Sequence, residues 1–76
     1  MIMLPHGRIL SIGQVWESND ERRLRAVRIM GFEFHAEDPT MTAVRVKNVV
    51  TGKISFILAK NFTIGTRGWS LLKEAA

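Results

Sequence analysis

The chain has 76 residues, enough for one small domain with a limited core. It has no cysteine, and its two histidines, His6 and His35, lie far apart, so we expect no disulfide and no structural metal site. Eleven Lys and Arg against seven Asp and Glu give a formal net charge of +4. A basic balance of this size attracts phosphate groups, but it is also ordinary for a small soluble surface.

No apolar run is long enough to cross a membrane, and residues 1–12 lack the basic start and continuous apolar stretch of a signal peptide. These features predict a cytoplasmic protein with no membrane association. Pro5 and Gly7 interrupt regular structure near the start. We therefore expect an irregular N-terminal leader over residues 1–11 and a single small β-barrel domain over residues 12–76.

The first predicted strand spans residues 12–16 and ends in Val15 and Trp16. After a polar loop, residues 23–30 are predicted as the second strand because they contain β-branched residues that partly alternate with arginines. A helix over residues 21–28 is the alternative, because the preceding Ser and Asn can cap a helix. The segment Arg22–Arg28 is thus left open between strand and helix.

A longer connection, residues 31–40, follows the second strand. Its alternating Phe32-Glu33-Phe34 is expected to continue that strand past Gly31 through a β-bulge. The Asp-Pro pair further along starts a turn, so the strand is predicted to end before it.

A tight hairpin is the clearest element of the chain. Two apolar-alternating runs, residues 41–49 and 53–59, flank Thr51-Gly52-Lys53, and glycine supplies the positive φ that a tight turn requires. The runs are the third and fourth predicted strands. A single 3₁₀ turn is predicted at residues 60–62, with Phe62 tucked into the end of the barrel, followed by a loop and a last strand at residues 69–73.

This order of elements predicts an all-β fold, a small five-stranded antiparallel SH3-like or Tudor-like barrel, because closure removes the unpaired edges of so small a sheet. The expected core consists of the apolar residues that alternate inward on these strands. They are Val15, Trp16, Val27, Ile29, Val44, Val46, Ile54, Phe56, Phe62 and Leu71.

Four short motifs and one aromatic residue carry a resemblance to known proteins. They are Gly13-Gln14-Val15-Trp16, Asp20-x-Arg22, Asn48-x-x-Thr51-Gly52-Lys53, Gly68-Trp69-x-Leu71 and Phe62. Over about residues 12–72 the chain resembles short SH3-like β-barrel proteins encoded by phages and prophages, whose function is unsettled. The resemblance implies the barrel fold and a phage or mobile-element origin, and it implies no catalytic residue. The chain departs from that group in residues 32–41, which form a longer connection.

Cationic side chains are concentrated on the second and third predicted strands. In an extended strand Arg23 and Arg25 share one face about 7 Å apart, comparable to the spacing of phosphates. The residues predicted to bind nucleic acid, as DNA or RNA and without sequence preference, are Arg23, Arg25, Arg28, Arg45 and Lys47. The alternative is a solvated surface balanced by the acidic residues at 17–21.

The loop Phe32–Met41 supports a second hypothesis, a protein-interaction module. Phe32, Phe34 and His35 would contact a host or phage protein if they are exposed, although partial burial is expected. Such a module would be an inhibitor of a host protein or a small virion or assembly component. A sheet edge is the other docking surface, and it would also allow a homo-oligomer.

No catalytic or metal-ligating constellation is predicted. The serines have no fixed relation to either histidine, and the polar cluster at residues 33–38 matches no metal loop. Thr51-Gly52-Lys53 lacks the first glycine of a phosphate-binding loop. We therefore expect a protein that is not an enzyme, with no cofactor and no metal.

Overall fold

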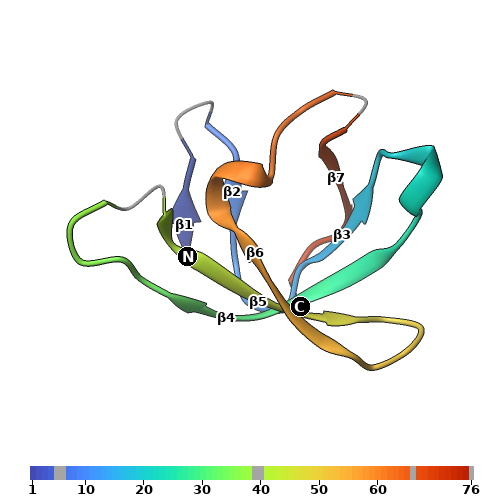
Figure 1. Ribbon diagram of the computed structural model, residues 1–76, viewed down its shortest axis with the longest axis horizontal. Coiled ribbons are helices and arrows are strands. Elements are labelled where there is room, and N and C mark those ends of the chain that lie inside the picture. The colour runs from blue at the N-terminus through green and yellow to red at the C-terminus, as the bar shows by residue number, and fades with distance from the viewer. Residues whose placement is uncertain (5–6, 39–40, 66, 76) are drawn as a thin grey trace.

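The structure is a computed structural model that describes residues 1–4, 7–38, 41–65 and 67–75. The strands within them are β1 (Ile2–Met3), β2 (Ile9–Leu10), β3 (Val15–Ser18), β4 (Ala26–Glu33), β5 (Ala43–Asn48), β6 (Ile54–Leu58) and β7 (Trp69–Lys73). The 3₁₀ turns η1 (Glu21–Arg23) and η3 (Ala59–Asn61) lie before β4 and after β6. The strands form a β1–β2 hairpin and a five-stranded antiparallel sheet of order β6-β5-β4-β3-β7 (Figure 1). The predicted all-β class and the five antiparallel strands are confirmed.

Strand β4 is the long central strand, and a β-bulge lets both of its halves face the core. It pairs with β3 through residues 26–28 and with β5 through residues 27–33, with a register shift between Ile29 and Gly31. Strict alternation would place Ile29 and Phe32 on opposite faces of the sheet. The extra residue, Met30, allows both to pack inward, and it confirms the predicted continuation of the strand past Gly31.

The predicted hairpin is confirmed as the connection between β5 and β6. The Asn48 side chain accepts hydrogen bonds from the backbone N–H groups of Val50 (2.9 Å) and Thr51 (3.0 Å). Gly52 has a φ of +77°, the left-handed conformation that glycine adopts without strain. The side chain of Asn48 therefore closes the turn that the glycine makes possible.

The chain before β4 differs from the prediction at both ends of the polar loop. The first sheet strand begins at Val15, three residues later than expected, and ends at Ser18, two residues later. Asp20 accepts a hydrogen bond from the N–H of Arg22 (3.0 Å) and so caps η1. Because this capped turn holds residues 21–23, the second strand begins only at Ala26, and the open segment Arg22–Arg28 is a 3₁₀ turn followed by a strand.

The described residues 1–4 and 7–11 contain two short paired strands, which corrects the predicted irregular leader in that part of the chain. Ile2 pairs with Leu10 and Met3 pairs with Ile9, and both Leu4 and Leu10 are buried in the same core cluster as the sheet residues. Arg8 links this hairpin to the rest of the molecule, because its guanidinium donates to the carbonyl oxygens of Trp69 (2.6 Å) and Thr63 (3.1 Å).

The core lies on one face of the sheet and is centred on three aromatic rings. The rings of Trp16 and Trp69 both contact Phe62, with centroids 5.8 and 5.4 Å away. Seven predicted core residues are buried, namely Val15, Trp16, Val27, Ile29, Val44, Val46 and Phe62. The predicted burial of Phe62 after a 3₁₀ turn is confirmed.

Three predicted core residues, Ile54, Phe56 and Leu71, are instead exposed. The reason lies in the sheet register for the first two, because residues directly opposite one another share a face of the sheet. Phe56 is opposite Arg45 and Ile54 is opposite Lys47, and both cations point away from the core. On β6 it is Ile57 that is buried. Leu71 lies on β7, an edge of the sheet order.

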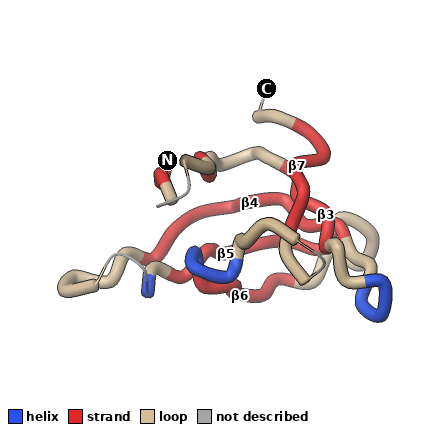
Figure 2. The backbone as a smooth tube through the Cα atoms, turned by 90° about the horizontal axis from the view of Figure 1, so that it is seen from above, coloured by secondary structure: helices blue, strands red, loops and turns tan. Residues whose placement is uncertain are grey.

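The connections before and after β4 extend from opposite ends of the sheet, as both views show (Figures 1 and 2). One contains η1, and the other is the described part of the loop after β4. The predicted loop surface and the predicted arginine cluster therefore lie at different ends of the molecule.

Candidate nucleic-acid interface

The five cations predicted to bind phosphate separate into two groups. Arg28 is directly opposite Lys47 in the β4–β5 pairing, and Arg45 is opposite Gly31 beyond the bulge. All three side chains are exposed on the face of the sheet away from the core. Arg23 belongs to η1 and Arg25 lies between η1 and β4, outside this part of the sheet. The structure therefore does not bring the five residues into one surface.

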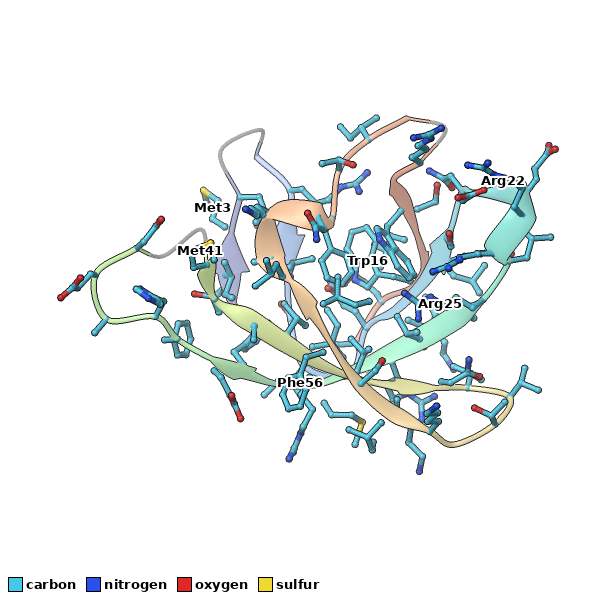
Figure 3. The ribbon with its side chains drawn as sticks, viewed as in Figure 1. Met3, Trp16, Arg22, Arg25, Met41 and Phe56 are labelled. Carbon is cyan, nitrogen blue, oxygen red and sulfur yellow. The ribbon has the colours of Figure 1, made fainter. Side chains whose placement is uncertain are left out.

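We call the first group, with its apolar neighbours, the outer basic face: Arg28, Arg45, Lys47, Ile54 and Phe56. Its members come from three adjacent strands, β4, β5 and β6, whose neighbours lie about 4.8 Å apart. Along β5, Arg45 and Lys47 are separated by about 7 Å because one inward residue lies between them. Figure 3 shows Phe56 on the side of the sheet opposite Trp16.

The outer basic face carries three cations, and one carboxylate shares that side of the sheet: Glu33, opposite Ala43, borders a hollow with Arg45. Within the described residues, no carboxylate lies at ion-pair distance from Arg28, Arg45 or Lys47. One ion pair among the described residues joins Arg22 to Asp20, with 3.5 Å between Nε and Oδ1. An anion that reaches this face therefore meets three cations on adjacent strands, an arrangement suited to successive phosphate groups.

Arg25 lies in a different environment, next to the core. Its guanidinium lies over the ring of Trp69, 5.2 Å from the centroid, in a cation–π contact. Together with Arg23, Arg67 and Asp20 it borders a hollow of about 340 Å³. The prediction that Arg23 and Arg25 share a strand face is wrong, because Arg23 belongs to η1.

Asp20 is the acidic residue of that hollow, and its main role is local. The hydrogen bond from the backbone N–H of Arg22, reinforced by the positive charges of Arg22 and Arg67, holds the pKa of the Asp20 carboxyl below its ordinary value. The ionised carboxylate caps η1, so its charge is already engaged when a ligand approaches.

The three residues of the alternative partner surface also have different environments. Phe32 packs partly against the core, whereas Phe34 is 70% exposed, with the two ring centroids 6.0 Å apart. The Nδ1 atom of His35 accepts hydrogen bonds from the N–H groups of Glu37 (3.3 Å) and Asp38 (2.9 Å). His35 thus shapes its own turn, and Phe34 is the ring that this loop presents to solvent.

A hollow of about 580 Å³ is bordered by Arg8, Gln14, Trp16 and Glu74 among others. Gln14 is buried here, and its Oε1 accepts from the Trp16 indole N–H (3.0 Å) and the Ser11 N–H (2.8 Å). Its amide donates to Glu74 Oε1 (2.8 Å). These bonds satisfy the buried polar groups of the site, so the arrangement is structural.

Sequence reasoning missed two residues of these sites. Phe56 was predicted to be buried, and the signal that corrects it is the β5–β6 register, which the sequence alone leaves open. Gln14 belongs to the Gly-Gln-Val-Trp motif, where it attracts attention only as part of the resemblance. A glutamine two residues before a buried tryptophan is consistent with a partner for the indole N–H.

In the described part of the chain, no group of three or more His, Asp or Glu side chains is placed to hold a metal ion. None of its helical segments is long and apolar enough to traverse a bilayer. No protein-family model, curated protein or solved structure matches this chain.

Proposed function

We propose that this protein binds nucleic acid without sequence preference, through phosphate contacts made by Arg28, Arg45 and Lys47 of the outer basic face. The observation that carries the proposal is the cross-strand pairing of Arg28 with Lys47, next to Arg45, on the face opposite the core. The contacts are to phosphate rather than to base edges, so binding is weak and depends strongly on salt.

The number of phosphate contacts, three, predicts how strongly binding depends on salt. The logarithm of the binding constant should fall with the logarithm of salt concentration, with a slope of about −2 for single strands and about −3 for duplex. The experiment is fluorescence anisotropy with labelled 20-nucleotide DNA and RNA at several salt concentrations. Wild type is compared with Arg28→Gln/Arg45→Gln/Lys47→Gln.

A matched control variant is Arg23→Gln/Lys60→Gln/Arg67→Gln, which removes the same charge from η1, η3 and the loop before β7, outside the outer basic face. We expect the first variant to lose about tenfold or more in affinity, its salt slope falling by about one for each cation, and the control to retain more of its binding. Equal losses in the two variants would show that net charge alone attracts the ligand. Absence of binding by wild type at the lowest salt would overturn the proposal.

We infer that the fold is an SH3-like barrel. The order strand, polar loop, strand, loop, strand, tight turn, strand, 3₁₀ turn and strand, read from β3 to β7, supports this assignment. So does the bulge in β4, because bulges bend a sheet toward closure. The resemblance to short phage and prophage proteins then suggests a phage accessory protein acting in the cytoplasm of its host.

A second candidate function, docking on a host or phage protein, is favoured by one observation. Phe34 is 70% exposed on the loop that extends beyond β4. A partner bound there would be lost on Phe34→Ala, whereas Phe56→Ala would retain it. Cross-linking in host extract, compared between these two variants and wild type, tests this candidate. An identical set of cross-linked proteins for wild type and Phe34→Ala would argue against it.

A further inference from the structure

An aromatic ring is exposed among the cations of the outer basic face. Phe56 is 53% exposed and lies directly opposite Arg45 on the neighbouring strand. Ile54, two residues before it on β6, is exposed beside Lys47. A single exposed apolar side chain is ordinary, but Phe56 and Ile54 together form an apolar patch beside two cations, and such patches mark binding surfaces.

We propose that the outer basic face binds single-stranded nucleic acid, with one base stacked on Phe56 while the adjoining phosphates lie against Arg45 and Lys47. This inference rests on the proposed function and specifies its ligand. A ring beside cations on a sheet face supplies the two interactions that single-strand binding proteins use, stacking for the bases and charge for the backbone. Stacking tolerates any base, which agrees with binding that has no sequence preference.

Duplex nucleic acid offers the ring no comparable contact. Bases in a duplex are stacked on one another and present only their edges in the grooves. The cations of the outer basic face can contact the phosphates of a duplex. Phe56, however, finds no exposed base there on which to stack. The preference for single strands should therefore depend on Phe56, whereas the salt dependence depends on the cations.

The other aromatic residues are less suited to this role. Phe34 is more exposed than Phe56, but it lies beyond the end of β4 with no cation paired opposite it in the described sheet, and the acidic residues Glu37 and Asp38 follow it in the sequence. Trp69 is buried, with the guanidinium of Arg25 over its ring. Phe56 is exposed with Arg45 directly opposite it and Lys47 diagonally opposite on the same neighbouring strand, and Phe34 becomes the natural control.

The test compares a labelled thymidine 20-mer with a 20-base-pair duplex, at low salt, for wild type, Phe56→Ala, Phe56→Trp and Phe34→Ala. We expect wild type to prefer the single strand. Phe56→Ala should weaken single-strand binding about tenfold and leave duplex binding and the salt slope unchanged. Phe56→Trp should retain or strengthen it, and Phe34→Ala should match wild type. Circular dichroism establishes that each variant is folded.

A structural readout accompanies the affinities. On addition of the thymidine 20-mer, the NMR signals of the Phe56 ring should shift upfield because of the stacked base. Duplex bound as tightly as single strand, or single-strand binding unchanged in Phe56→Ala, would overturn this inference and leave the proposed function standing. If wild type binds neither probe, both are wrong.

Discussion

At the scale of single residues, Gly68 shows how a backbone contact determines a residue type. A Cβ atom at this position would overlap the backbone carbonyl of Thr63. The same carbonyl accepts a hydrogen bond from the N–H of Trp69 (2.8 Å), and the Gly68 carbonyl accepts one from the N–H of Asn19 (2.9 Å). The chain is therefore held close to itself at the start of β7, and only glycine leaves room for it.

The first prediction is that Gly68→Ala lowers the free energy of unfolding by about 1–3 kcal/mol, as overpacking at a well-ordered site does. Gly31→Ala is the control, because a Cβ there meets only the flexible end of Arg45 at 3.8 Å. Urea denaturation measures both variants. Equal stability of Gly68→Ala and Gly31→Ala would show that the loop before β7 adjusts freely.

The second prediction concerns pH and Asp20. Its pKa in the folded protein is lowered, chiefly by the hydrogen bond from the Arg22 N–H, so the ionised form stabilises the fold. This contribution is fully present above the ordinary aspartate pKa of about 3.9 and is lost as the pH falls through the lower folded value. Asp20→Asn retains a capping oxygen but does not titrate. The stability of wild type relative to Asp20→Asn should therefore decline below about pH 4, as measured by urea denaturation at several pH values. A difference in stability between wild type and Asp20→Asn that stays constant with pH would contradict this prediction.

At the scale of elements, the β1–β2 hairpin is part of the core rather than an appendage. Leu10 is fully buried and Leu4 nearly so, and Arg8 places its guanidinium 4.9 Å from the centre of a Trp16 ring. The sequence did not predict this hairpin because strands of two residues are too short to show alternation, and Pro5 and Gly7 indicated only a break. By contrast, β7 was predicted with its observed bounds because Trp69–Lys73 follows a clear loop signal.

The third prediction tests this hairpin with two neighbouring residues. Leu10→Ala should lower the free energy of unfolding by about 2–5 kcal/mol, because it removes a buried side chain and leaves a cavity. Ile9→Ala, on the exposed side of the same strand, should cost much less. Thermal denaturation followed by circular dichroism measures both. Similar melting temperatures for the two variants would mean that the hairpin contributes little to stability.

At the scale of the whole molecule, one core cluster joins all parts of the fold. It contains residues of the hairpin, such as Leu10, together with Trp16, Val46 and Phe62 of the sheet and its connections. The strand succession and most of this cluster could be predicted, because β-branched residues and glycine turns are local signals. That Arg45 and Phe56 share a face of the sheet could not be predicted, because it depends on which residues of β5 and β6 are opposite one another. Most of the candidate site could therefore be identified only from the registers of the β4–β5 and β5–β6 pairs.

The fourth prediction is that the protein unfolds in a single cooperative transition. Fluorescence of the buried Trp16 and Trp69, far-UV circular dichroism and the amide signals of β1 and β2 should give the same midpoint in urea. Their coincidence is expected because the hairpin and the sheet bury their apolar residues against each other. Loss of the β1 and β2 signals at a lower urea concentration would instead identify the hairpin as a separate unit.

Strand β6 has a consequence for the colloidal behaviour of the protein. Its sequence, Ile-Ser-Phe-Ile-Leu, carries no charge, and in the described sheet it is an edge strand. Uncharged apolar edges promote aggregation, and here Lys53 and Lys60 flank the segment and oppose stacking by repulsion. Salt that releases a bound polyanion also screens this repulsion. Concentrated stocks of the free protein should therefore keep best at low ionic strength, where the like charges of neighbouring molecules hold the β6 edges apart.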